Sequence, residues 1–272
     1  MLERIDRLAL AVHDASIAAQ DFAAIFDTEI VSIAPDAQVG AMRTTLQWGQ
    51  DQLELLEPIG EGAVARFMKA GRSGIFAGGF ALTDPSALVA QLRDKLVVHE
   101  QVGGRFLILP EDLGGTGVIL SPRVQRERVG LNDKIWQLTY AMVELGPAVA
   151  HYTDLFGLHD DYTNYYTSDQ FGYAGAITWF DARDGGLLDS LEYLEPNDPA
   201  KAVARFVQRN STGIYMASIE TDAIPEIKQR VTATGSGWQG TDFGGFIHPK
   251  RLHGLLLGLV SYENWNARRP LP

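Results

Sequence analysis

The sequence repeats itself: short motifs of the first half return, in the same order, in the second half. Leu-Glu-Leu-Leu-Glu-Pro at 53–58 matches Leu-Glu-Tyr-Leu-Glu-Pro at 191–196. Ala-Val-Ala-Arg-Phe follows at 63–67 and again at 202–206. Because the matched positions stay 138 or 139 residues apart, two similarly built halves account for nearly all of the 272 residues.

The apolar patterns of each half predict mixed α and β structure. Residues 4–12 alternate as a strand does, and Asp14 precedes a helical apolar pattern that ends at Phe26. Antiparallel strands follow, and the same series then recurs three times. The predicted fold class is therefore α+β, with four βαβββ modules in two domains (1–124 and 131–264) joined by a charged stretch at 123–130. Further strands are expected at 42–48, 52–56, 74–82, 106–109, 117–120, 135–142, 175–180, 187–194, 213–220, 245–248 and 255–260, and further helices at 85–92, 146–156 and 224–231.

The composition narrows the classes of partner. A net charge of −11 argues against a nucleic-acid partner, because phosphate backbones need a basic face. The sequence has no apolar run long enough to span a bilayer, no leader pattern and no cysteine, so we expect a cytoplasmic protein without thiolate chemistry. A small-molecule ligand is the expected partner, and a homodimer is left open.

Several segments together resemble the vicinal oxygen chelate superfamily, also called the glyoxalase/bleomycin resistance/dioxygenase fold. They are residues 5–12, the paired Leu-Glu-x-Leu-Glu-Pro motifs, 151–158, and 246–250 leading to 254–257. The nearest resemblance is to the glyoxalase-like and methylmalonyl-CoA epimerase-like branch. It implies that two βαβββ modules wrap into one cup-shaped barrel, so that four modules form two tandem cups. It also implies a divalent metal in an active cup, held by residues of the first and last strand of each module.

The residues at those ligand positions depart from the family. They are Arg7, Glu54, Ala77 and Ser121 in the first cup, and Gln137, Glu192, Met216 and Gly258 in the second. Arginine has no free lone pair, alanine and glycine have no donor, and a thioether suits soft metals. We therefore predict no metal and no cofactor at the usual sites. A relocated metal site drawn from Glu192, Glu220, Gln137 and His253 is the alternative.

Other side chains are expected to occupy the two cups. Strand periodicity places Arg7 and Glu54 inward in the first cup, either as a structural ion pair or as contacts to a ligand carboxylate or carbonyl. In the second cup it places Gln137, Thr139, Ser190, Glu192, Met216, Ser218 and Glu220 inward. Glu192 is the predicted general acid or base, with Glu220 beside it and His253 as a further candidate at the rim. A hydrogen-bonded interior without chemistry is the alternative.

Aromatic residues are concentrated around the second cup, and Tyr140 and Trp179 among them are predicted to contact a ligand. Ordinary packing is the alternative for this set, which comprises Trp136, Tyr140, Tyr162, Tyr165, Tyr166, Tyr173, Trp179, Tyr215 and Trp238. The function predicted from these features is a metal-independent lyase or isomerase acting on an aromatic or hydrophobic carbonyl compound. The alternative is a non-catalytic binding or sequestration protein, as in the bleomycin resistance members.

Overall fold

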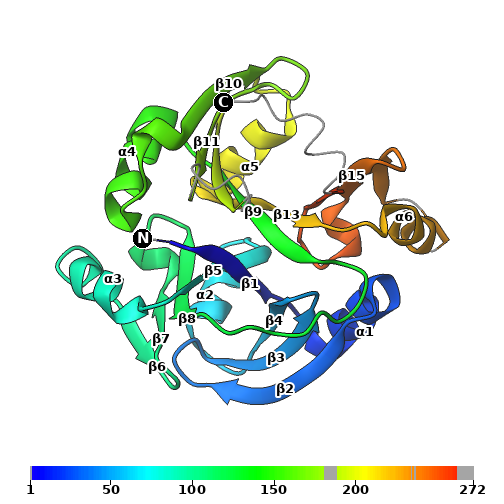
Figure 1. Cartoon of the computed structure of the whole chain (residues 1–272), viewed down its shortest axis with the longest axis horizontal. Helices are drawn as coiled ribbons and strands as arrows, with labels where there is room; N and C mark the ends of the chain where they lie inside the picture. The colour runs from blue at the N-terminus through cyan, green and yellow to red at the C-terminus, as the bar shows by residue number, and fades with distance from the viewer. Residues whose placement is uncertain (1, 181–188, 234, 236, 262–272) are drawn as a thin grey trace.

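The chain folds into two eight-stranded sheets of the same design, seen in a computed structural model that describes residues 2–180, 189–233, 235 and 237–261 (Figure 1). The strand order is β2-β3-β4-β1-β5-β8-β7-β6 in the first sheet and β10-β11-β12-β9-β13-β16-β15-β14 in the second. The first sheet consists of β1 (Arg4–Ala11), β2 (Glu29–Asp36), β3 (Ala41–Trp48), β4 (Asp51–Pro58), β5 (Gly74–Leu82), β6 (His99–Gln101), β7 (Arg105–Ile108) and β8 (Gly117–Pro122). The second consists of β9 (Lys134–Ala141), β10 (Thr163–Ser168), β11 (Tyr173–Trp179), β12 (Ser190–Pro196), β13 (Gly213–Glu220), β14 (Trp238–Gly240), β15 (Gly244–Ile247) and β16 (Leu257–Val260).

Each sheet is made of two βαβββ modules, which confirms the predicted α+β class. The first strand of a module pairs in parallel with its last, as β1 does with β4 and β9 with β12. The first strands of successive modules pair antiparallel, as β1 does with β5 and β9 with β13. Helices α1 (Ala15–Phe26), α3 (Pro85–Leu92), α4 (Leu145–Phe156) and α6 (Ile224–Ala233) follow the first strands, while α2 (Ala63–Lys69) and α5 (Ala202–Asn210) join the modules.

The second strand of each module is β2, β6, β10 or β14. Three of these strands were not predicted, and the sequence around β10, at 161–173, suits either a loop or a strand. All four lie at the edges of their sheets. β2 is exposed over most of its length, and β6 and β14 have three residues each, so these strands carry no alternating burial for a pattern to reveal. The predicted strand at 187–194 begins outside the described residues, and its described part is β12.

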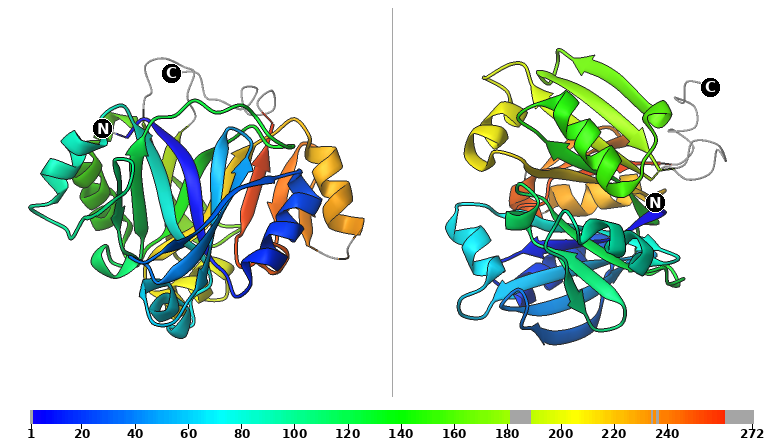
Figure 2. Two further views of the ribbon diagram at one scale, coloured as in Figure 1. Left: turned by 90° about the horizontal axis from the view of Figure 1, so that it is seen from below. Right: turned by 90° about the vertical axis from the view of Figure 1, so that its left-hand side faces the viewer.

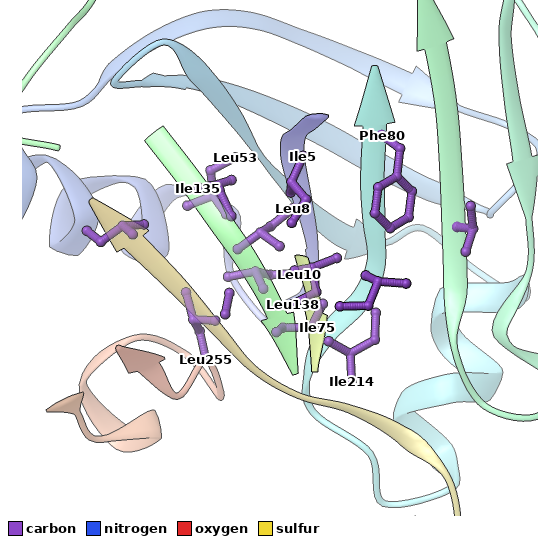
Figure 3. Packing of buried hydrophobic residues seen from close by; sticks show 14 of the residues in the cluster. Ile5, Leu8, Leu10, Leu53, Ile75, Phe80, Ile135, Leu138, Ile214 and Leu255 are labelled. Atoms are coloured by element: carbon purple, nitrogen blue, oxygen red, sulfur yellow. The ribbon is translucent and has the colours of Figure 1, made fainter. Parts of the chain in front are cut away.

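The two sheets pack against each other through one shared apolar core (Figure 3). Leu8 and Leu10 of β1 face this core from one side, and Leu138 of β9 and Ile214 of β13 face it from the other. The opposite faces of the same strands point outward into the two cups. Figure 2 shows the halves stacked in this way, with α1 of the first half beside α6 of the second. Because the core is shared, the division into domains 1–124 and 131–264 remains a prediction. Residues 262–264 lie outside the described residues.

Two buried carboxylates at corresponding positions bind the halves together. Asp51 accepts a hydrogen bond from the backbone N–H of Ile135, at 2.5 Å, and Asp189 accepts one from the N–H of Ile5, at 2.7 Å. Each aspartate thus reaches from the start of the last strand of one module, β4 or β12, to the first strand of the other half. In the part of the chain that the structure describes, no helix is both long and apolar enough to cross a membrane.

Candidate functional site

The first cup is closed by an ion-pair network at its floor. Arg7 on β1 donates from Nη1 to Glu54 Oε1 on β4, at 3.1 Å. Arg105 on β7 donates from both terminal nitrogens to the two oxygens of Glu54, at 2.5 and 2.6 Å. Arg7 also contacts Asp6, at 2.9 Å, and Ser121 Oγ, at 3.1 Å. Burial alone would raise the pKa of Glu54, but Arg105 and then Arg7 outweigh it and lower the pKa to about 2.

Apolar side chains fill the rest of the first cup. Leu56, Phe76, Leu107 and Ile119 pack over its concave face together with small alanines of β1. The space left beside Glu54 is about 10 Å³, too small for a ligand. Arg7 and Glu54 therefore form a structural ion pair. The first cup has no space for a ligand that would contact these two residues.

The second cup opens into a cleft of about 1310 Å³. Gln137 on β9, Glu192 on β12, and Met216 and Ser218 on β13 line it, as strand periodicity predicted. The difference between the cups follows from corresponding positions that lie 139 residues apart. Ile119 in the first cup corresponds to Gly258 in the second, and Arg105 corresponds to Gly244. An apolar side chain and a guanidinium that close the first cup are thus both absent from the second.

Glu192 is buried at the floor of this cleft without a cationic partner. Its exposed fraction is 8%, and it makes no ion pair with any described residue. Thr139 Oγ1 donates to Glu192 Oε2, at 2.6 Å, and the Tyr166 hydroxyl donates to Oε1. Burial raises the pKa of Glu192, while the hydrogen bonds from Thr139 and Tyr166 oppose the shift. The two glutamates therefore have pKa values shifted in opposite directions.

Tyr166 reaches Glu192 across a glycine. Tyr166 on β10 pairs with Gly175 on β11, and a Cβ at Gly175 would lie 2.6 Å from the Tyr166 ring. The ring can occupy that position only because residue 175 has no side chain. Burial raises the pKa of Tyr166 and the charge of Glu192 raises it further, so the hydroxyl keeps its proton and acts as a donor.

Several predicted site residues lie elsewhere. Tyr140 is on the opposite face of β9 from Gln137 and Thr139, where it is fully buried and stacks with Tyr193 in the shared core. Strand alternation requires this placement, so the prediction that Tyr140 contacts a ligand is corrected.

Three further candidates do not line the cleft. Trp179 is half-buried at the end of β11, and Glu220 is half-buried at the end of β13. His253 has a left-handed φ of 51° and its Nε2 contacts Asp21 on α1, at 2.9 Å. The structure therefore does not bring Glu220 or His253 together with Glu192.

The donor set of the second cup does not fit a divalent metal. Gln137, Glu192, Met216 and Gly258 offer one carboxylate, one amide and a thioether, which is short of a first coordination shell for a hard cation. Among the described residues, no group of three or more His, Asp or Glu side chains could hold a metal ion. The relocated set is dispersed as well, since His253 pairs with Asp21.

Sequence reasoning missed two features of the cleft: the hydroxyl of Tyr166 at Glu192, and the basic side chains of Lys201, Arg205 and Arg209 along one wall. The repeated Ala-Val-Ala-Arg-Phe motif contains Arg66 and Arg205. A position-by-position comparison of the two copies of that motif and of its flanks would have found the cations. Of the predicted aromatic set, Trp136, Tyr173 and Tyr215 line the cleft.

No protein-family model matches the sequence, and no curated protein is similar to it. Among solved structures, a mutant of 4-hydroxymandelate synthase from Streptomyces coelicolor is similar over 96% of this chain and 93% of its own, with a TM-score of 0.70 and 13% identity. Methylmalonyl-CoA epimerase from the same organism matches 46% of this chain and 99% of its own, with 24% identity and a TM-score of 0.40. The epimerase from Mycobacterium tuberculosis matches 48% and 89%, with 22% identity and a TM-score of 0.40.

The similarity to the synthase extends over nearly all of both chains. It shows that this protein has the vicinal oxygen chelate fold, as the two sheets of paired βαβββ modules indicate. The fold predicted from the sequence motifs is confirmed.

Proposed function

We propose that this protein is an enzyme that binds a small carbonyl compound in the second cup and moves a proton next to the carbonyl with Glu192. The observation that carries the proposal is the contrast between two corresponding glutamates. Glu54 is held by two arginines in a filled cup, whereas Glu192 has a raised pKa, no cationic partner among the described residues and an open cleft above it. A buried carboxylate with a raised pKa in a cleft is typical of an acid–base catalyst.

In the proposed reaction, ionised Glu192 accepts a proton from the carbon next to the carbonyl. Thr139 and Tyr166 hold the carboxylate and keep their own protons. Gln137 Nε2 donates one hydrogen to Ser190 Oγ, at 3.2 Å, and its other hydrogen is available for a carbonyl oxygen. Such a donor stabilises the enolate charge that develops on that oxygen. An isomerase returns the proton to a different position, while a lyase expels a leaving group after the same first step.

The walls of the cleft support an aromatic or hydrophobic substrate body. Trp136, Phe206, Tyr215 and Met216 line it, and each offers a large apolar surface. Aromatic and thioether side chains of this kind are common in pockets for flat or apolar ligands.

A binding protein of the same fold is the second candidate, and one observation favours it. Glu192 is the only carboxylate among the described residues that line the cleft, and both of its oxygens already accept hydrogen bonds. A sequestration protein would need no second proton-transfer group. It would release its ligand unchanged.

The test is deuterium uptake. The protein is incubated in D₂O with a panel of ketones, thioesters and 2-oxo acids, and exchange at the carbon next to the carbonyl is followed by proton NMR. We expect Glu192→Gln to lower the exchange rate by about 10²- to 10⁴-fold while ligand binding remains. Glu144→Gln, an exposed carboxylate before α4 with no side-chain cap, is the matched control. Exchange by Glu192→Gln at the wild-type rate would refute the catalytic role. Binding without exchange by the wild-type protein would establish the second candidate.

A further inference from the structure

The cleft of the second cup has a charge opposite to that of the whole chain. The chain has 23 basic and 34 acidic residues. The described residues that line the cleft include three with a permanent positive charge, Lys201, Arg205 and Arg209, and one carboxylate, Glu192. An excess of positive charge in an acidic protein attracts anions to this cleft.

The three cations form a single stripe. They are four residues apart from one another, from the residue before α5 to its last turn, and side chains at this spacing lie on one face of a helix. Arg205 lies close enough to Tyr215 for its charge to oppose the burial that raises the pKa of this tyrosine. Tyr215 itself lines the cleft, so the stripe faces the same space as Glu192.

Within the described part of the chain, no acidic side chain neutralises any of the three cations. No described carboxylate lies within ion-pair distance of Lys201, Arg205 or Arg209, and the one side-chain hydrogen bond of Arg205 goes to the backbone oxygen of Ala200. Basic side chains on a helix usually gain support from acidic neighbours one turn away. Three neighbouring cations without such a partner repel one another, and a bound anion would remove that repulsion.

The first half provides an internal comparison. The positions that correspond to Lys201 and Arg209 are Gly62 and Ala70, so two of the three charges are absent there. Arg66 corresponds to Arg205, and it pairs with Glu111 at 2.6 Å. The position that corresponds to Glu111 is Lys250. At these three corresponding positions the open cup thus has two additional cations, and the acid that neutralises the third is replaced by a base.

We infer that the ligand of the second cup carries an anionic group, a carboxylate or a phosphate, that is held by Lys201, Arg205 and Arg209. This inference rests on the proposed function for the location of the ligand. The planar guanidinium of arginine suits both anions, because it donates two parallel hydrogen bonds to a pair of oxygens. The substrate class is then a carbonyl compound with an apolar body and a negatively charged end.

The experiment is a titration of ¹⁵N-labelled protein with sodium phosphate and, separately, with sodium succinate, at an ionic strength kept constant with sodium chloride. Constant ionic strength keeps the screening of charges equal throughout each titration, so the shifts report binding. We expect saturable shifts of the amide signals of α5, and the anion that binds more tightly identifies the group. Arg205→Gln/Arg209→Gln should weaken this binding at least about tenfold, as expected for the loss of charge-assisted hydrogen bonds.

The matched control is Arg66→Gln/Lys69→Gln, which removes the same charge from α2 at the closed cup. Unchanged binding in this control is expected, and equal loss in both double variants would overturn the inference. Lack of saturable shifts with either anion would overturn it too. Glu192→Gln separates the two proposals. If Glu192→Gln loses deuterium exchange and the wild-type protein binds neither anion, the proposed function stands and this inference fails. If anions bind through α5 but no carbonyl compound exchanges, the inference stands and the catalytic proposal fails.

Discussion

Leu138 and Gly78 meet in the shared core, and their sizes are matched across the two sheets. Leu138 on β9 is 0% exposed, and a Cβ built on Gly78 of β5 would lie 2.2 Å from Leu138 Cδ1. Carbon atoms that are not bonded to each other do not approach so closely. The next neighbours of that Cβ are Leu138 Cγ, at 3.6 Å, and Ile214 Cδ1, at 3.8 Å, which are ordinary contacts.

These distances predict that Gly78→Ala destabilises the wild-type protein but stabilises the Leu138→Ala variant. Gly78→Ala alone should destabilise the protein by about 1–3 kcal/mol through overpacking. Leu138→Ala alone should cost about 2–5 kcal/mol, because it leaves a cavity in a fully buried site. Leu138→Ala also removes the Cδ1 and Cγ atoms that obstruct residue 78. In that background, Gly78→Ala adds a methyl group to free space and should be stabilising, so the two effects should couple by about 1 kcal/mol or more.

Urea unfolding followed by far-ultraviolet circular dichroism measures this cycle, with equal slopes required for the four proteins. Wild-type, the two single variants and the double variant give the coupling free energy directly. If Gly78→Ala costs the same in both backgrounds, the two residues do not pack against each other as described. The reasoning about a core shared between the halves would then be wrong at this point.

Three more predictions concern the closed cup and the link between the halves. Glu54→Gln leaves Arg105 without a charge partner and leaves buried Arg7 with Asp6 alone, and should lower the free energy of unfolding by about 3–5 kcal/mol. Glu192→Gln breaks no ion pair and should cost clearly less, so equal losses in urea unfolding would contradict the contrast between the cups. Because the pKa of Glu54 falls from 4.5 to about 2 on folding, its stabilising contribution is present above pH 4.5 and is lost as the pH falls towards 2. The free energy of unfolding should therefore fall less steeply with acid in Glu54→Gln than in the wild-type protein. Fragments 1–130 and 131–272, expressed separately, should each lack a cooperative unfolding transition because each exposes its half of the shared core, and two independently folding fragments would disprove this.

The sequence was sufficient for the fold because its strongest signals are those of buried elements. The central strands β1, β5 and β9 are buried almost throughout, and the helices carry an apolar stripe behind capping residues such as Asp14 and Asp84. Because the chain is duplicated, a clear pattern in one half also indicated the element at the corresponding position of the other half. Edge strands such as β2 escaped this reasoning because solvent covers both of their faces, and an alternating pattern arises only where one face is buried.

The site was predictable only in part, for a related reason. Period two placed Gln137, Glu192 and Ser218 in one cup, because they lie on central strands with a fixed register. Tyr166 lies on the edge strand β10, whose register the apolar pattern does not determine, and its approach to Glu192 depends on the missing side chain of Gly175. The choice of Tyr140 was an error within the sequence argument itself, because a residue next to Thr139 must face the other side of β9.

The duplication also explains how one chain can contain both a filled cup and an open one. An isoleucine such as Ile119, when buried, contributes about 1.5–3 kcal/mol relative to its exposed state, and the second half forgoes this at Gly258. The second half also lacks the ion pairs of Arg105, because Gly244 stands at the corresponding position, yet it keeps the buried carboxylate of Glu192. Each of these differences lowers the stability of the second half, and the shared core with its reciprocal Asp51 and Asp189 bonds is what can tolerate the loss. Among the described residues, the second cup has an open cleft, a carboxylate without a cation and three cations without an acid, where the first cup is filled and its glutamate is neutralised. A purely structural role does not require these features. Their joint occurrence in one cup therefore favours a ligand over relaxed packing as the reason that the second cup stays open.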